Sequence, residues 1–120
     1  MKQDIYFIDA FTKDTFFGNP AAVMFSEIDD KVLMQKIATE NNLSETAFVN
    51  LKNNSIRWFS PSCEVNLCGH ATLASAFVYF NFLENTKKSV TWNSASGYLK
   101  VKKKDAFLQL DFPKDKFVQV

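Results

Sequence analysis

Apolar and polar residues alternate over several short stretches of the chain, a pattern that is typical of half-buried β-strands. The turn residues Asn53 and Asn54 separate two of these stretches, and further turns are expected near Ser96–Gly97 and Lys104–Asp105. The predicted strands cover residues 4–11, 44–51 and 55–61, a segment that follows a turn within 16–25, and up to three strands within 89–112.

Two other segments predict helices. Residues 29–42 carry apolar side chains at helical spacing, begin with two aspartates and end with two asparagines. Residues 69–83 are apolar on nearly every side, with small residues in the first half and bulky ones in the second. Because a surface helix shows a polar stripe, we expect this helix to lie inside a sheet that wraps around it. The predicted fold class is α+β, with a mixed or antiparallel sheet around a central buried helix.

The composition narrows the class of protein. A chain of 120 residues with 47% hydrophobic content predicts one domain over 1–120. A net charge of +1 argues against nucleic acid as a partner, and the basic run at 100–104 is explained by a solvated strand edge. The first residues lack the apolar core of a signal peptide, and the apolar run at 71–83 is too short to span a bilayer. We expect a soluble, cytoplasmic protein with no membrane partner.

Both cysteines and the only histidine lie close together in the sequence, at Cys63, Cys68 and His70. A zinc site uses about four ligands, which this set does not supply, so we predict no metal site. Nothing in the sequence indicates an oxidising compartment, so both cysteines are predicted to be free thiols. Cys63 is interpreted as structural.

The predicted helix at 69–83 starts with Gly69, His70 and Thr72, where the first backbone amides have no helical partner. Free amides at the positive end of the helix dipole suit a carboxylate or phosphate. The alternative is an ordinary helix start at which Thr72 bonds locally. The residues alone favour neither.

Glu45 is the second candidate for chemistry. Strand alternation places Glu45 on the same face as Ala47, and an apolar cleft would raise the pKa of its carboxyl toward that of a general acid or base. The alternative is an exposed strand glutamate or a cap for a neighbouring turn. Asn19, in the Gly18-Asn19-Pro20 turn, offers an amide to a ligand or serves the turn alone.

Three motifs occur in a specific order: FxGNPAAV at 16–23, NLSETAFV at 42–49 and RWFSPxxEVxLCGHATLASA at 57–76. Together they resemble the N-terminal half of the PhzF-type phenazine biosynthesis-like family, which is related in fold to diaminopimelate epimerase. The resemblance runs over essentially the whole chain. It implies one half of a two-domain fold, with the second, pseudo-symmetric half absent from the chain.

The resemblance also implies a function. The best-studied reaction of the family is an isomerisation that moves a proton on a small carboxylic acid without a metal or organic cofactor, at a site between two half-domains. Glu45 inherits the acid/base role, and His70 lines the pocket and contacts the substrate. The remaining residues implied to bind substrate are Ser44, Gly69, Ala71, Thr72 and Asn19.

Cys68 leaves two interpretations open. In the related epimerases a cysteine directly before the helix glycine acts as one of two thiol bases, so Cys68 is either a second acid/base, as in a two-thiol racemase, or a buried neutral thiol. A further alternative is a non-catalytic half-domain that binds a small molecule or a partner. A homodimer, or a second half-domain chain, would restore the cleft and cover some of the 13 phenylalanines.

Overall fold

The computed structural model describes residues 5–10, 19–104 and 107–111, except for the side chains of residues 9, 10, 19, 20 and 107. Its strands join in one sheet of order β1-β2-β3-β4-β6-β7-β8, and β5 pairs with β4. The strands are β1 (Ile5–Ala10), β2 (Asn19–Phe25), β3 (Glu45–Asn50), β4 (Ser55–Phe59), β5 (Glu64–Val65), β6 (Ser89–Ser94), β7 (Gly97–Lys104) and β8 (Phe107–Asp111). The helices are α1 (Lys31–Asn41) and α2 (Gly69–Val78), which continues into the π-helical turn η2 (Tyr79–Leu83).

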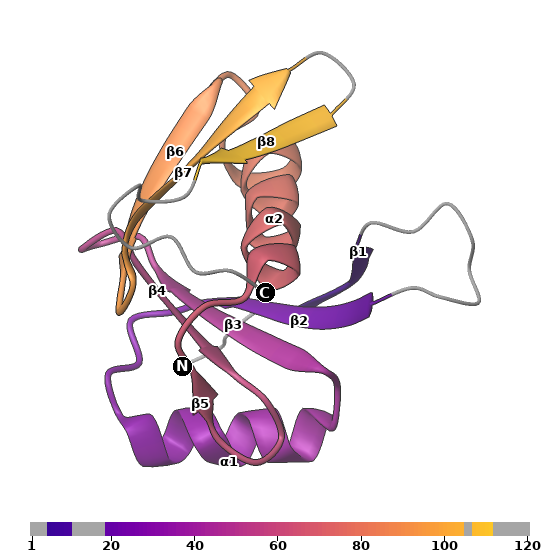
Figure 1. The fold of residues 1–120 in the computed structure, drawn as a ribbon, viewed down its shortest axis with the longest axis vertical. Coiled ribbons are helices and arrows are strands. Elements are labelled where there is room, and N and C mark those ends of the chain that lie inside the picture. The colour runs from indigo at the N-terminus through magenta and orange to yellow at the C-terminus, as the bar shows by residue number, and fades with distance from the viewer. Residues whose placement is uncertain (1–4, 11–18, 105–106, 112–120) are drawn as a thin grey trace.

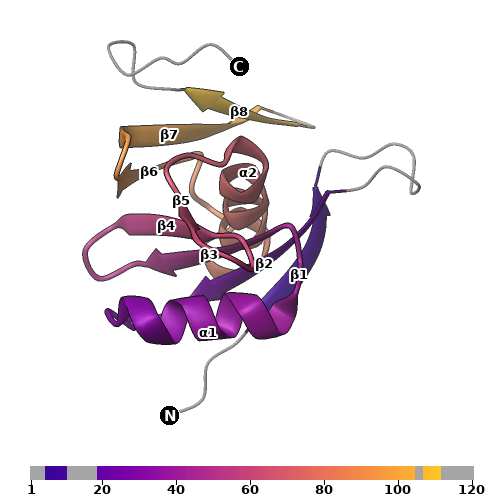
Figure 2. The same ribbon diagram turned by 60° about the horizontal axis from the view of Figure 1, so that its bottom comes forward.

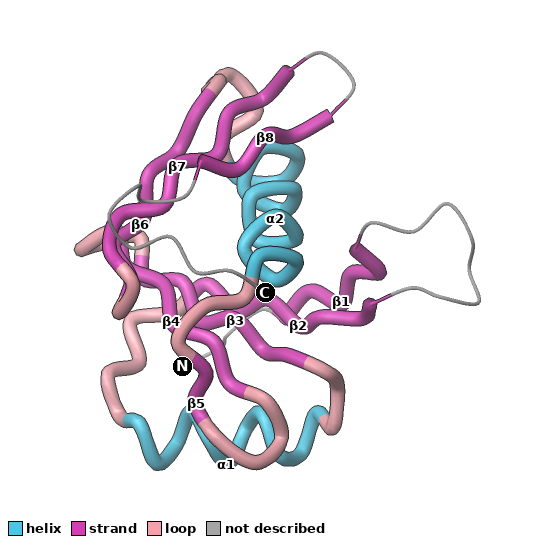
Figure 3. The backbone as a smooth tube through the Cα atoms, in the orientation of Figure 1, coloured by secondary structure: helices cyan, strands magenta, loops and turns pink. Residues whose placement is uncertain are grey.

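The sheet is mixed and strongly curved. The β2–β3 and β4–β6 pairs are parallel, and all other pairs are antiparallel. On one side of β4, Ser55 pairs with β6 while Trp58 and Phe59 pair with β5, so the sheet divides there. The β6–β8 part turns over α2, which contacts β1 and β8 at the two ends of the sheet (Figures 1 and 3). This confirms the α+β class and the sheet that wraps around a helix.

The two helices cover opposite faces of the β1–β4 part of the sheet, as Figure 2 shows from below. Alternate residues of β3 therefore enter two separate hydrophobic clusters: Ala47 and Val49 pack with α2, whereas Phe48 packs with α1. Both clusters are closed to solvent, so β3 is buried on both faces. The second cluster consists of Met24, Met34, Ala38, Phe48 and Phe59.

The ends of α1 follow the sequence prediction closely. Asp30 caps its N-terminus, and its carboxylate accepts hydrogen bonds from the amides of Val32 and Leu33, at 2.9 and 3.3 Å. Asn42 ends the helix in the left-handed conformation, at φ 53°, and its amide donates to Ala38. The aspartate pair and the asparagine pair thus mark a real start and stop.

The second helix differs from its prediction in two ways. The segment was expected to be one buried helix over 69–83, but its last five residues form the π-helical turn η2. Phe80 is fully buried, whereas Phe77 and Phe82 are 44% and 62% exposed and Leu83 is also exposed. The small residues Ala71, Ala74 and Ala76 are buried around most of the circumference of α2, which lets the sheet approach closely, and only the narrow side that carries Phe77 is left exposed.

The sequence analysis missed one element, β5, because two residues are too few to show alternation. The three strands predicted after residue 88 are confirmed as β6, β7 and β8. Among the described helices, none combines the length and the apolar character that a membrane span requires.

Candidate active site

Glu45 is the first residue of β3, and strand alternation directs its side chain to the α2 face of the sheet together with Ala47 and Val49. The side chain is 15% exposed. Burial raises the pKa of the Glu45 carboxyl above its usual value, and a hydrogen bond with Cys68 partly opposes this effect. The sequence analysis expected an apolar cleft around this carboxyl; the structure shows a mostly buried carboxyl that lies against a thiol and an imidazole.

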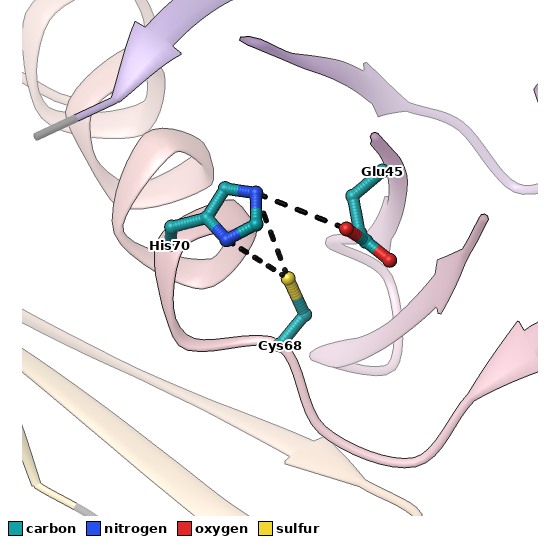
Figure 4. Close-up of side chains that lie close together, drawn as sticks. All are labelled: Glu45, Cys68 and His70. Carbon is teal, nitrogen blue, oxygen red and sulfur yellow. Dashed lines mark hydrogen bonds and ion pairs between the residues drawn. The ribbon is translucent and has the colours of Figure 1, made fainter. Parts of the chain in front are cut away.

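Cys68 and His70 come from the start of α2 and meet Glu45 there (Figure 4). The Cys68 sulfur lies 3.4 Å from Nδ1 and 3.9 Å from Nε2 of the imidazole. Nε2 of His70 lies 3.9 Å from Oε1 of Glu45. A strand and a helix start that are separated by more than twenty residues thus place a carboxyl, a thiol and an imidazole in mutual contact.

Burial disfavours the charged form of each of these three groups. It raises the pKa of the Cys68 thiol to about 12, and the nearby Glu45 carboxylate adds to the increase. It lowers the pKa of His70, which is 22% exposed. The approach of His70 to Glu45 is therefore a polar contact in which burial opposes both charges, rather than a strong ion pair.

Cys68 is also the N-cap residue of α2, but its side chain makes no capping hydrogen bond. The backbone amides of His70 and Ala71 lie near enough to the sulfur to favour its thiolate form, although desolvation outweighs them. The unpaired amides that the sequence predicted at this helix start therefore face the sulfur of Cys68.

Thr72 requires a correction. It was expected to offer a free amide to the substrate, but its amide donates to the Cys68 carbonyl at 3.1 Å and its hydroxyl donates to the same oxygen at 2.7 Å. The hydroxyl also accepts a hydrogen bond from Trp58 Nε1 at 3.0 Å, and Thr72 is fully buried. The structure shows the local bonding that was the alternative interpretation. Thr72 therefore holds the backbone of Cys68 in place through its carbonyl oxygen.

The other predicted residues differ in how close they come to the three groups. Gly69 and Ala71 flank His70 in the first turn of α2, and the Ala71 side chain is fully buried. Ser44 is exposed and directly precedes Glu45. Asn19 begins β2, two residues before Ala21, the register partner of Glu45, so its backbone lies at the same edge of the sheet; its side chain and Gly18 fall outside the described residues.

Trp58 is the residue that the sequence analysis missed. It lies on β4, it is fully buried, and its indole is the only hydrogen-bond donor that the described residues direct to the Thr72 hydroxyl. A buried tryptophan N–H usually finds a hydrogen-bond partner, but the sequence does not show which residue supplies it.

An open depression of about 560 Å³ lies elsewhere, over the outer face of α1. Gln35 and Thr39 line it, and both already donate hydrogen bonds to the Pro61 carbonyl. Because α1 covers the opposite face of the sheet from Glu45 (Figure 2), this depression has no connection to the three-residue site.

Comparison with known proteins gives related chains with isomerase names. An uncharacterized isomerase of Pseudomonas aeruginosa is 48% identical over 117 residues, which cover 94% of this chain and 44% of that protein. A crystal structure of a PhzF family protein of Enterococcus faecalis is similar, with a TM-score of 0.85 and 48% identity over 94% of this chain and 45% of the other. The chain thus spans less than half the length of these relatives.

A more distant structure shows the same fold. It is described as a predicted epimerase of Pseudomonas aeruginosa, with a TM-score of 0.65 and 20% identity over 89% of this chain. The model of the PhzC/PhzF family, described as "phenazine biosynthesis-like protein", matches residues 8–119. This match confirms the resemblance seen in the three motifs over nearly all of the sequence. The chain therefore belongs to the phenazine biosynthesis-like (PhzC/PhzF) family and corresponds to the N-terminal half of its relatives.

Proposed function

We propose that the chain supplies one wall of an isomerase active site, in which Glu45 moves a proton on a small carboxylic acid without an organic cofactor. The observation that carries the proposal is the position of the Glu45 carboxyl, which contacts Cys68 and His70 at the start of α2. A carboxyl whose pKa is raised by burial is a better general acid near neutral pH than an exposed one. The isomerase names of relatives support the same class of reaction.

His70 is proposed to bind the substrate. Its imidazole is partly exposed, and burial lowers its pKa, so a neutral ring can donate one hydrogen bond to a substrate oxygen while its other nitrogen faces the sulfur. The start of α2 adds the positive end of a helix dipole, which favours a substrate carboxylate and negative charge that develops during proton transfer. Ser44 and Gly69 directly precede Glu45 and His70, and Asn19 begins the neighbouring strand β2, so the backbone of each lies near this position.

A second wall is proposed to come from another half-domain. The side chains of Glu45 and His70 keep 15% and 22% of their surface exposed, and the chain spans about 45% of the length of its relatives. Phe77 leaves an apolar side chain exposed on α2, the helix that starts at the site. A second copy of the chain or a separate half-domain would cover this surface and exclude water from the site. Light scattering over a wide concentration range tests the homodimer.

The central experiment is solvent deuterium exchange into a panel of small unsaturated carboxylic acids, followed by mass spectrometry. We expect Glu45→Gln to lower the exchange rate by about 10²- to 10⁴-fold. Glu40→Gln is the matched control, because Glu40 is an exposed glutamate on α1 at the other face of the sheet. Equal rates for wild type and Glu45→Gln would contradict the proposal and favour the non-catalytic half-domain, which predicts binding without exchange.

A second variant distinguishes the two-thiol racemase from proton transfer by Glu45. That mechanism needs a Cys68 thiolate, which a pKa of about 12 makes scarce near neutral pH. If Glu45 is the base, Cys68→Ser retains more activity than Glu45→Gln. The reverse order would assign the proton transfer to the thiol.

A further inference from the structure

The same three side chains carry the kinds of atom that ligate metal ions. Glu45, Cys68 and His70 each direct a metal-ligating atom into one small space, and these three atoms lie within 4.8 Å of one another. We propose that this cluster binds one thiophilic divalent cation, of which Zn²⁺ is the typical example, through the Cys68 sulfur, one imidazole nitrogen of His70 and the Glu45 carboxylate. The inference does not depend on the proposed isomerase activity.

The distances fit a small tetrahedral ion. Nε2 of His70 lies 3.9 Å from the Cys68 sulfur and 3.9 Å from Oε1 of Glu45. With bonds of about 2.0 to 2.3 Å, a tetrahedral zinc ion separates its ligand atoms by roughly 3.3 to 3.8 Å. These two distances need to shorten by roughly 0.3 to 0.6 Å to match the tetrahedral separations, and no two of the three ligand atoms are more than 4.8 Å apart.

The donor set selects the class of ion. One thiolate, one imidazole and one carboxylate suit a borderline-soft cation such as Zn²⁺ and do not suit Mg²⁺ or Ca²⁺, which prefer oxygen ligands. The thiol loses its proton to solvent when the ion binds, and thiolate and carboxylate together neutralise the two positive charges. Three protein ligands leave a fourth position for water or a substrate oxygen.

The position of the ligands explains why the sequence predicted no metal site. Cys63, Cys68 and His70 were too few for a site of about four ligands, and the structure leaves the exposed Cys63 outside this cluster. The third ligand comes from the start of β3, which no short spacing in the sequence connects with Cys68. An ion held here occupies the Glu45 carboxylate and would block proton transfer by it.

The experiment titrates the reduced, metal-free chain with Co²⁺, which substitutes for Zn²⁺ and gives an ultraviolet charge-transfer band when sulfur is a ligand. We expect one Co²⁺ per chain, displacement by Zn²⁺, and loss of the band in Cys68→Ser. Cys63→Ser is the matched control and keeps the band. Glu45→Gln keeps the band but binds at least about tenfold more weakly, as expected when a ligand or its support is removed.

A second measurement uses only the unmutated chain and so does not depend on how the variants fold. Zn²⁺ should protect one of the two thiols from a thiol-specific reagent and leave the exposed Cys63 reactive. Protection of neither thiol, or a charge-transfer band that is lost in Cys63→Ser and kept in Cys68→Ser, overturns the inference. If the unmutated chain binds no metal ion but Glu45→Gln loses deuterium exchange, the metal site is overturned and the proposed isomerase activity still stands.

Discussion

The helices α1 and α2 pack on opposite faces of the same strands, and their N-termini are built differently. Asp30 caps α1 with two hydrogen bonds from its carboxylate to first-turn amides. Cys68 occupies the same position in α2 and makes no such bond, while Glu45 and His70 contact its thiol. At the start of α1 a side-chain carboxylate thus accepts hydrogen bonds from the first-turn amides, whereas at the start of α2 a thiol that makes no capping bond lies against a carboxyl and an imidazole.

The packing of α2 provides the test with the largest expected effect. Phe80, in the π-helical turn, is fully buried, and Phe77 on the preceding turn is 44% exposed. Phe80→Ala should lower the free energy of unfolding by about 3 to 5 kcal/mol, as expected for a phenylalanine removed from a core. Phe77→Ala should cost less than about 1 kcal/mol in the monomeric chain. Urea denaturation of both variants measures the difference, and equal losses would show that the outer side of α2 is covered.

The next largest effect on stability is expected at Thr72, which bonds to the Cys68 carbonyl. Thr72→Val keeps the shape of the side chain but removes the partner of Trp58 Nε1 and the hydroxyl bond to the Cys68 carbonyl. We expect a loss of about 1 to 3 kcal/mol, because a buried indole N–H is left unpaired. Ser75→Ala, which removes only a hydroxyl bonded to Ala71 within the helix, is the control and should change stability by less. If Thr72→Val left the free energy of unfolding unchanged, the Thr72–Trp58 pair would not be what holds the start of α2.

The cap of α1 gives a smaller effect. Asp30→Ala removes both carboxylate bonds and should lower the free energy of unfolding by about 1 kcal/mol. Asp29→Ala, one residue earlier and also exposed, controls for the loss of charge. Because α1 lies on the other face of the sheet, Asp30→Ala should leave thiol accessibility at Cys68 unchanged. A change in that accessibility would show that the two faces are coupled.

The smallest effect concerns an ion pair that connects β4 and β5 on the α1 side. Arg57 donates two hydrogen bonds of 2.8 Å to Glu64, and this lowers the pKa of the Glu64 carboxyl below its ordinary value of 4.5. A carboxyl whose pKa is lower in the folded state stabilises the fold at pH values above its pKa in the unfolded state. This stabilisation is lost as the pH falls through the pKa of the folded state. Glu64→Gln should therefore cost about 1 kcal/mol near neutral pH.

The pH dependence checks the origin of this contribution. The stability difference between the wild type and Glu64→Gln should shrink as the pH is lowered from about 7 to about 3, because the wild-type carboxyl becomes protonated. Glu40→Gln, at an exposed position on α1, serves as the reference. A difference that stays constant with pH would assign the effect to packing.

The sequence by itself determined most of the elements and the family. Alternation predicted β1, β3 and β4, the paired aspartates and asparagines marked the ends of α1, and three ordered motifs indicated the phenazine biosynthesis-like fold. These features are local, so neighbouring residues are enough to reveal them. That Glu45 shares one face of β3 with Ala47 also follows from local alternation.

Only the tertiary structure decided which groups meet. Glu45 joins Cys68 and His70 because the parallel pairing of β2 and β3 and the position of α2 in the curved sheet bring a strand start to a helix start. The same packing buries Thr72 against Trp58 and so removes it from the residues able to bind a substrate. It leaves Phe77 exposed although its segment is apolar on nearly every side. Contacts between residues far apart in the chain depend on how the sheet bends, and no local pattern records that bend.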